Sequence, residues 1–438
     1  MPDSAERVFI VEDGTTRSSS NYTLTGGSHT LDISQLSVNV TGSRQYDGTK
    51  TVSSSDLNLT NLVSGETVSL TGAGTVADEN VGANKTVTSD NLALTGPNAS
   101  NYTLGSYTTN FEILPKVIDL TGTKVYDGQT TVPNANLTVT TGISDESLGL
   151  KGSGSVISAA AGAGKSISLG TLQLDSIGSG SDSNYTLSGG THTFDITRRA
   201  LTFSSSRDYD GTAIANTSGL TFSLSNLVSG EALLLSGSGT VASKDVSAGT
   251  QNITLGTIAL VDNTGVASNY SLTSGTMDIN QKQVNLSGTK VYDTNSTLNN
   301  SIVSVASGLV GSETLGLTGD VVTNSANVGT YLASAGQLNV GSTTIALADG
   351  TNGGLGNNYS INEGTFIITQ RAVTISGTRV YDGSKTVSSS DITTFNNIAG
   401  GETLTLSGSG TFLESEGVGS GKTINVTGLT LGLSLIHI

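Results

Sequence analysis

Along much of the chain, apolar and polar side chains alternate with a period of two, as they do in half-buried β-strands. Residues 67–70 (Thr-Val-Ser-Leu) and 403–406 (Thr-Leu-Thr-Leu) are clear examples, and glycine-rich breaks follow them at 72–74 and 408–410. Asp-Gly, Asn-Gly and Gly-Gly pairs occur between such runs, where a tight turn needs positive φ. No window has the spacing of an amphipathic helix. The pattern therefore predicts an all-β chain of short strands.

Two tyrosine motifs return along the chain at steps of 80 to 89 residues. The copies of the first motif are Tyr46-Asp47-Gly48, Tyr126-Asp127-Gly128, Tyr209-Asp210-Gly211, Tyr292-Asp293-Thr294 and Tyr381-Asp382-Gly383. The second motif is Asn-Tyr-Thr/Ser-Leu/Ile, and its tyrosines are Tyr22, Tyr102, Tyr185, Tyr270 and Tyr359. A third landmark is an acidic turn, usually Gly-Glu, which the second repeat keeps only as Ser144-Asp145-Glu146. A period of this length predicts separate modules, because the coils of a solenoid repeat at shorter intervals.

The boundaries between repeats lie where a strand end that contains isoleucine is followed by a short polar or basic stretch of sequence. They predict partial repeats at 1–34 and 370–432, complete repeats at 35–114, 115–197, 198–280 and 281–369, and a non-native tail at 433–438. We expect about six or seven strands in each repeat, forming a small β-sandwich-like, immunoglobulin-like module. Because the links are short, we also expect a semi-rigid, monomeric rod.

Composition narrows the possible partners and chemistry. The net charge is -16, which argues against nucleic acid as a partner. The absence of cysteine excludes thiol chemistry and a disulfide scaffold. No stretch approaches the ~20 consecutive apolar residues of a membrane helix. Charged residues make up only 12% of the chain, and no set of acids or histidines suggests catalysis. We therefore expect a protein that is not an enzyme.

The recurring motifs have a structural and a ligand-binding interpretation. An Asp-Gly pair after a strand is typical of a turn, so we expect the preceding tyrosine to cover the core with its hydroxyl in water. Tyrosine is also common in binding sites, which leaves ligand contact as an alternative. In the second motif we expect an asparagine turn followed by a core strand. Each copy is also formally an acceptor site for N-glycosylation, which we attribute to composition.

A cofactor is not expected, and Ca²⁺ is the one metal for which the sequence offers candidate ligands. Calcium needs several oxygen ligands that converge on one point. The nearest approaches are Asp182 with Asn184 in one loop and Asp208 with Asp210 around a tyrosine. Neither resembles an EF-hand loop.

The repeats resemble the YDG repeat of bacterial haemagglutinin-like adhesins. The resemblance rests on 121–128 (Thr-Gly-Thr-Lys-Val-Tyr-Asp-Gly) and 287–293 (Ser-Gly-Thr-Lys-Val-Tyr-Asp), together with the Gly-Glu turn and the second tyrosine motif. The fourth copy departs from the pattern at Thr294, so its turn is expected to be of another type. The resemblance implies a long, exported, adhesive surface protein in the filamentous-haemagglutinin style. It supplies neither a ligand nor a catalytic residue.

Together these features predict the structural or adhesive repeat region of a bacterial adhesin, at the cell surface or secreted. It would act as a stalk or as a multivalent array, with host glycans or surface proteins as partners. The signal and anchor are expected outside the 438 residues. The alternative is a set of lectin-like modules. That function needs exposed aromatic side chains, but tryptophan is absent and only Tyr107 and Tyr331 lie outside the two motifs.

Overall fold

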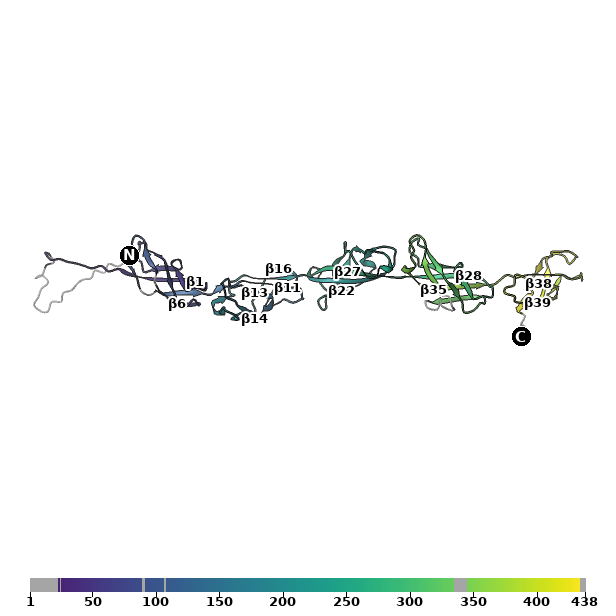
Figure 1. Cartoon of the computed structure of the whole chain (residues 1–438), viewed down its shortest axis with the longest axis horizontal. Helices are drawn as coiled ribbons and strands as arrows, with labels where there is room; N and C mark the ends of the chain where they lie inside the picture. The colour runs from purple at the N-terminus through teal and green to yellow at the C-terminus, as the bar shows by residue number, and fades with distance from the viewer. Residues whose placement is uncertain (1–22, 24, 89–90, 106–107, 335–344, 434–438) are drawn as a thin grey trace. The chain divides into compact units, whose positions relative to one another are not determined.

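The structure is a computed structural model, and it describes residues 23, 25–88, 91–105, 108–334 and 345–433 (Figure 1). These residues form strands β1–β41 and single turns of 3-10 helix, with no α-helix in the part of the chain that is described. The predicted all-β class is confirmed. The chain divides into two compact units, the first made of residues 1–124, 130–158 and 163–195, the second of 125–129, 159–162 and 196–438.

The third module shows the architecture that the others share. Its strands are β20 (Arg199–Asp208), β21 (Ile214–Asn216), β22 (Thr221–Ser225), β23 (Leu233–Ser236), β24 (Ser238–Thr240), β25 (Gln251–Asn252), β26 (Ala259–Asp262) and β27 (Tyr270–Asn280). Four of them form a sheet in the order β22-β20-β27-β25. The remaining strands form two antiparallel pairs, β21 with β24 and β23 with β26. The module thus has eight strands, more than the six or seven expected.

The first and last strands of this module lie side by side and run in the same direction. β20 pairs with β27 in parallel, from Arg199 opposite Tyr270 to Asp208 opposite Asn280. The outer strands β22 and β25 pair with them antiparallel. Because the central pair is parallel, the chain enters the module at one end of the sheet and leaves at the other. The Tyr-Asp-Gly turn after β20 consequently lies beside the exit of the module.

The core of the third module lies between the sheet and the two strand pairs. Phe203, Met277 and Ile279 of the central strands are at most 5% exposed, and they pack with Ala215, Leu220, Val241 and Ile253. Apolar side chains occupy alternate positions of β20, whose other face carries polar groups. Val284 and Tyr359 of the following module belong to the same buried cluster. The hydrophobic core therefore continues across the boundary between these two modules.

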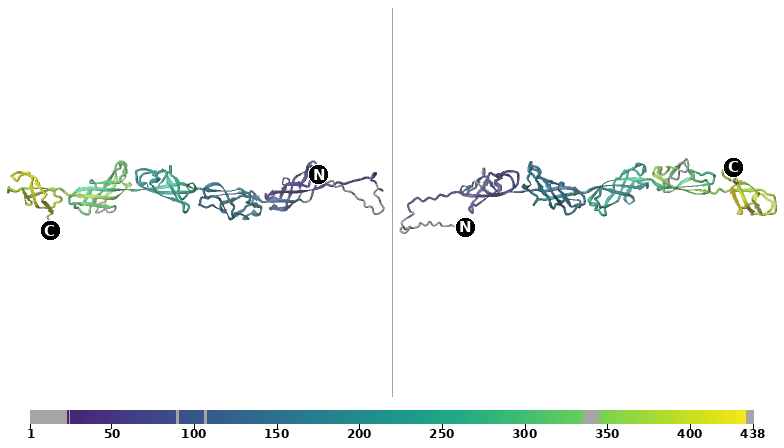
Figure 2. Two further views of the ribbon diagram at one scale, coloured as in Figure 1. Left: turned by 180° about the vertical axis from the view of Figure 1, so that it is seen from behind. Right: turned by 90° about the horizontal axis from the view of Figure 1, so that it is seen from below.

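The other modules repeat this plan with small variations (Figures 1 and 2). The first contains β1 (Leu36–Gln45), β2 (Thr51–Ser53), β3 (Leu57–Thr60), β4 (Ser69–Thr71), β5 (Ala73–Thr75), β6 (Gly82–Val87), β7 (Ala93–Thr95), β8 (Tyr102–Leu104) and β9 (Thr108–Leu114). The second contains β10 (Lys116–Val117), β11 (Leu120–Val125), β12 (Thr131–Pro133), β13 (Leu137–Val139), β14 (Gly149–Lys151), β15 (Ser153–Ser155), β16 (Gly162–Ser166), β17 (Gln173–Asp175), β18 (Tyr185–Thr186) and β19 (His192–Thr197). Their main sheets have the orders β3-β1-β9-β6 and β13-β11-β19-β16.

The fourth module keeps the plan although its Tyr-Asp motif ends in threonine. It contains β28 (Lys282–Val291), β29 (Thr297–Asn299), β30 (Val303–Ser307), β31 (Leu315–Thr318), β32 (Asp320–Val322), β33 (Gly329–Ser334), β34 (Ala346–Asp349) and β35 (Tyr359–Thr369). Its sheet order is β30-β28-β35-β33, with β28 and β35 parallel.

The fifth module contains only the first part of this plan. Its strands are β36 (Thr374–Gly377), β37 (Thr386–Ser388), β38 (Ile392–Asn396), β39 (Leu404–Phe412), β40 (Ile424–Asn425) and β41 (Leu429–Leu433). β36 pairs with β38, whereas β39 pairs with β37, β40 and β41. Among the described residues, β36 has no parallel neighbour of the kind that β27 provides for β20. No helix in the described part of the chain is long and apolar enough to cross a membrane.

Candidate functional site: the tyrosine–glutamate junctions

The Tyr-Asp-Gly motif forms a tight turn that its aspartate organises. Asp47 Oδ1 accepts the N–H of Thr49 at 2.9 Å, and Gly48 has φ 75°. Arg44, three residues before the aspartate, forms an ion pair with it. Burial alone would raise the pKa of Asp47, but the hydrogen bonds from Arg44 and Thr49 outweigh burial and hold the pKa below its usual range.

The basic residue before this turn recurs, but its role in the turn was not predicted from the sequence. Ion pairs of the same spacing join Arg207 to Asp210, Lys290 to Asp293, and Arg379 to Asp382. A Lys or Arg two positions before each motif tyrosine was the available signal. The pair fixes the turn relative to the strand that precedes it.

Each turn is tied to the last strand of its own module. The backbone N–H of Tyr46 donates to Leu114 at 2.9 Å, and Tyr209 donates to Asn280 at 2.9 Å. Tyr126 and Tyr292 make the same bond to Thr197 and Thr369. The next module begins a few residues after these acceptors, so the tyrosine ring faces that module.

The acidic turn of the following module supplies the partner of this ring. In each turn the glutamate N–H donates to the carbonyl three residues earlier, as in Glu231 to Val228 at 3.0 Å. The residue before Glu231 is Gly230, with φ 86°. In the second module Asp145 takes the same place with φ 63°. Aspartate tolerates this left-handed conformation, which explains the variant Ser-Asp-Glu sequence.

One carboxylate receives two tyrosine hydroxyls at three of the junctions. In the first unit, Glu146 accepts from Tyr46 through Oε1 and from Tyr185 through Oε2, both at 2.5 Å. Glu231 and Glu313 repeat the arrangement within the second unit, at 2.5 to 2.7 Å. Their tyrosine pairs are Tyr126 with Tyr270 and Tyr209 with Tyr359. The first tyrosine motif of one module and the second motif of the next thus meet at a single glutamate.

The two rings of each pair also contact one another edge to face. The centroids of Tyr46 and Tyr185 are 5.4 Å apart with an interplanar angle of 73°. The other two pairs have nearly the same geometry. Tyr46 is 4% exposed and Tyr209 is completely buried. We expected the hydroxyl of the first-motif tyrosine to lie in water, and this expectation is wrong, because at these junctions it is bonded to a carboxylate of the neighbouring module.

The last two Tyr-Asp motifs show what the following module contributes. Tyr292 donates to Glu402 of the fifth module. Tyr381, in the fifth module itself, leaves 60% of its surface exposed. Its turn is otherwise intact, since Asp382 Oδ1 accepts the N–H of Ser384 at 2.9 Å. Burial of the motif tyrosine therefore comes from the next module, not from the turn.

The asparagine of the second motif makes another contact across three of the junctions. Asn184 Oδ1 accepts the N–H of Val81 in the preceding module at 2.9 Å. Asn269 accepts from Ala161 at 2.8 Å, and Asn358 accepts from Val246 at 2.9 Å. All three side chains are at most 4% exposed. The asparagine does begin a turn before a strand, but its amide also binds a loop of the preceding module and is inaccessible to glycosylation.

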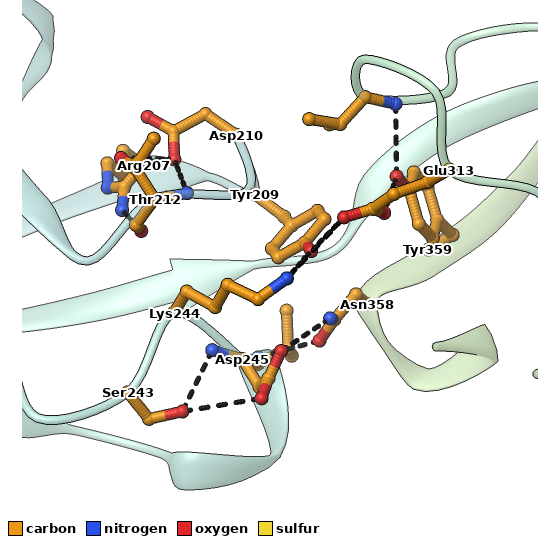
Figure 3. A network of polar contacts seen from close by, with 12 residues as sticks. Arg207, Tyr209, Asp210, Thr212, Ser243, Lys244, Asp245, Glu313, Asn358 and Tyr359 are labelled. Atoms are coloured by element: carbon orange, nitrogen blue, oxygen red, sulfur yellow. Dashed lines mark hydrogen bonds and ion pairs between the residues drawn. The ribbon is translucent and has the colours of Figure 1, made fainter. Parts of the chain in front are cut away.

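The junction between the third and fourth modules carries an additional charge pair (Figure 3). Lys244 Nζ lies 2.8 Å from Tyr209 Oη and 3.5 Å from Glu313 Oε1. Beside it, Asn358 Nδ2 donates to Asp245 Oδ1 at 2.8 Å. Two consecutive residues therefore bind the next module: Lys244 contacts Glu313 of its acidic turn, and Asp245 accepts from Asn358 of its second tyrosine motif.

The third residue of the Tyr-Asp-Gly motif packs against the acidic turn of the next module. A Cβ on Gly48 would lie 2.9 Å from Ile143 Cγ2, and one on Gly211 would lie 2.8 Å from Val310 Cγ1. At the last junction Thr294 replaces the glycine, and it lies against Gly400. Thr294 has φ 69°, within 10° of the motif glycines, whose φ is 74–79°. The expectation of another turn type at Thr294 is thus wrong.

We expect Thr294→Gly to stabilise the fourth module by about 1 kcal/mol, because a β-branched residue with positive φ is strained. Calorimetric unfolding of the whole chain would measure the change. Gly211→Thr is the matched reverse substitution and should destabilise the third module, since its Cβ would meet Val310. An unchanged or lower unfolding temperature for Thr294→Gly would contradict the assigned strain.

The buried tyrosines make the junctions sensitive to alkali. Burial, and then the hydrogen bond to Glu146, raise the pKa of Tyr46 to about 12. Burial and Glu231 raise the pKa of Tyr270 to about 12. In the unfolded chain a tyrosine has a pKa near ~10. Since the folded pKa is the higher one, this stabilisation is complete below pH ~10 and is lost as the pH rises towards ~12.

Denaturant unfolding at a series of alkaline pH values, with tyrosinate absorbance recorded in parallel, would test this dependence. The double variant Glu146→Ala, Glu231→Ala is the control. It should begin from a lower stability and lose less between pH ~10 and ~12, because the carboxylates no longer favour the neutral phenols. Parallel curves for the two proteins would count against the assignment.

The remaining candidate residues are placed as follows. Tyr22 and Tyr107 lie outside the described residues, and Tyr331 packs beside the core of the fourth module. Asp182 accepts from Ser176 Oγ at 2.9 Å, while Asn184 serves the junction. Asp210 binds Arg207 and Thr212, and Asp208 ends β20. Within the described part of the chain, no three His, Asp or Glu side chains are grouped as a metal site.

Comparison with known proteins identifies the repeat. No curated protein matched the chain. Among solved structures, the Bacillus anthracis TIE protein aligns with 9% identity over 76% of this chain and 68% of its own, with a TM-score of 0.16. A sequence model described as the YDG domain matches residues 30–110, 115–193, 197–277 and 368–434. These segments cover well over half of the chain, which therefore belongs to the YDG domain family.

Proposed function

We propose that this array of YDG modules is the stalk of a bacterial adhesin, at the cell surface or secreted, that spaces a binding region from the cell. The recurring Tyr–Glu–Tyr junction carries the proposal. It commits both tyrosine motifs to contacts between modules, and it recurs with the same partners at Glu146, Glu231 and Glu313. A set of contacts used repeatedly to join similar units supports a spacing role.

The same observation weakens the lectin-like alternative. Sugar-binding sites stack aromatic rings on the ligand, whereas Tyr46, Tyr126 and Tyr209 are at most 5% exposed. The described residues offer Tyr381 as an exposed motif tyrosine. Neither a catalytic role nor a cofactor is part of the proposal.

Small-angle scattering of the whole chain tests the stalk. A single compact globule of this length would have a radius of gyration of about 22 Å. We expect at least about twice that value from an extended array. The triple variant Glu146→Ala, Glu231→Ala, Glu313→Ala should have a smaller average radius of gyration and a broader distribution of it, because its junctions are loosened. A compact value for the wild-type chain would overturn the stalk, and saturable binding to mucin or a glycan array would favour a binding array instead.

A further inference from the structure

Three junctions bring two tyrosine rings into direct contact and bind both hydroxyls to one carboxylate. The ring centroids of each pair are 5.3–5.4 Å apart, with interplanar angles of 73–78°. The hydroxyls donate to the shared glutamate at 2.5 to 2.7 Å. The reactive ends of the two phenols, each a hydroxyl with the ring carbons beside it, therefore converge. The pairs are Tyr46 with Tyr185, Tyr126 with Tyr270, and Tyr209 with Tyr359.

A phenol in this setting is prepared to lose an electron. Removal of an electron makes the phenolic proton strongly acidic, so the reaction is easiest where a base already holds that proton. Here each hydroxyl donates to a carboxylate at the short distance of a charge-assisted hydrogen bond. All six rings are at most 5% exposed, so the ring that faces a newly formed radical is its partner in the pair.

We propose that the three tyrosine pairs are sites of oxidative cross-linking, at which a one-electron oxidant, such as a peroxidase with hydrogen peroxide, joins consecutive modules through dityrosine. Each ring gives one electron to the oxidant and one proton to the solvent by way of the glutamate. The two phenoxyl radicals form a bond between their Cε carbons, and the hydrogens of those carbons move to the oxygens, which restores both phenols. The chain loses two electrons and two protons in all, and one hydrogen peroxide is reduced to two waters.

The other motif tyrosines that the structure describes provide comparisons, because each lacks part of this arrangement. Among the described residues, contacts between tyrosine rings are found at the three junctions. Tyr102 donates to Glu66 of its own module, and Tyr292 donates to Glu402. Tyr381 is 60% exposed. Cross-linking at the pairs does not depend on whether the array spaces a binding region or binds a ligand itself.

The charge beside the shared carboxylate differs between junctions and should grade the reaction. Lys244 Nζ lies 2.8 Å from Tyr209 Oη, and a positive charge there opposes the removal of an electron. At the equivalent position the first junction has Glu79, whose negative charge acts on Tyr46, and the second has Ala159. We therefore expect the link to form most readily at the first junction and least readily at the third.

Photo-oxidation of the whole chain tests the proposal, with ruthenium tris(bipyridyl) and persulfate as the one-electron oxidant. The protein is kept dilute so that copies do not react with one another. Mass spectrometry of a proteolytic digest should then find three defined pairs of joined peptides, each pair lighter by two hydrogen atoms than the sum of its parts. Links formed chiefly by the exposed Tyr381, or pairing of tyrosines without preference, would overturn the proposal.

Substitution of one ring tests the pairing itself. Tyr185→Phe keeps the aromatic ring but removes the hydroxyl that is oxidised. It should abolish the link at Tyr46 and leave the links at the other two junctions unchanged, so that these serve as controls within the same molecule. An undiminished yield of linked Tyr46 would contradict the assigned pair.

Two further variants test the part played by charge. Glu146→Gln keeps the shape of the side chain but accepts a proton poorly, and it should lower the yield of the Tyr46 link severalfold. Lys244→Met removes the positive charge and should raise the yield of the Tyr209 link to that of the second junction. Unchanged yields in both variants would overturn the role assigned to the glutamate and to its neighbouring charge.

Discussion

Replacing Glu313 by alanine should weaken the junction between the third and fourth modules, together with the acidic turn on its fourth-module side, by roughly 3–5 kcal/mol in total. Glu313 is 9% exposed and accepts from Tyr209 at 2.7 Å and from Tyr359 at 2.6 Å. Both bonds go to a charged acceptor, and each such bond contributes about 1.5–3 kcal/mol. The substitution would also leave two buried hydroxyls and Lys244 without their common partner.

Native-state hydrogen exchange would measure this effect locally. The N–H of Val246 in the third module donates to Asn358 of the fourth and reports on the junction, whereas the N–H of Val310 donates to Tyr359 Oη within the fourth module and reports on its acidic turn. Because each 1.4 kcal/mol corresponds to a tenfold change, their exchange should accelerate about a hundredfold or more. Glu66→Ala is the matched control, since Glu66 accepts from Tyr102 and Asn101 of its own module. A similar loss of exchange protection in the two variants would show that the hydrogen bond between modules contributes little to stability.

Changing Asn358 to aspartate should be almost as disruptive, although the two side chains have the same shape. Asn358 is completely buried, and its Nδ2 donates to the Asp245 carboxylate at 2.8 Å. The substitution would replace that donor by a second negative charge in a completely buried position. We expect a loss of roughly 3 kcal/mol or more, because like charges and an unpaired buried carboxylate both oppose docking.

The other junctions provide graded controls for this substitution. The residue equivalent to Asp245 is Ala160 at the junction of Asn269 and Asn80 at the junction of Asn184. Asn184 Nδ2 donates to Asn80 Oδ1 at 3.0 Å. Asn269→Asp should therefore cost less than Asn358→Asp. Asn184→Asp should cost least, because the Asn80 amide can turn its donor towards the new carboxylate. Exchange at Val81, Ala161 and Val246 measures the three cases, and equal acceleration would mean that the facing side chain does not matter.

The sequence was sufficient for the modules but not for the way they are joined. Strand periodicity and glycine turns are local, so the alternation at 403–406 correctly places a strand within β39. The partners at a junction are about 100 residues apart, as in Tyr46 and Glu146. Equal spacing of motifs leaves open whether a tyrosine meets the glutamate of its own module or of the next. Only the parallel course of β20 and β27 places the turn beside the exit.

Two signals in the sequence could have indicated the junctions. The glutamate recurs in every repeat although the chain is only 12% charged, which suggests a specific partner for it. The basic residue two positions before each motif tyrosine also recurs, as in Arg207 and Arg379, and it indicates the ion pair of the turn that presents the tyrosine. Thr294, in contrast, could not have been interpreted from the motif alone. Its side chain lies against a small residue, Gly400, across the junction, and no motif of its own module indicates that contact.

The parallel central strands have a mechanical consequence. Tension on the chain would pull β20 from its first residue and β27 from its last, at opposite ends of the same pair. Such a load is directed along the strands and is shared by all the hydrogen bonds between Arg199 and Asp208 at once. An antiparallel hairpin pulled from its two ends would instead lose its bonds one at a time. Each complete module is therefore built to resist stretching by shear.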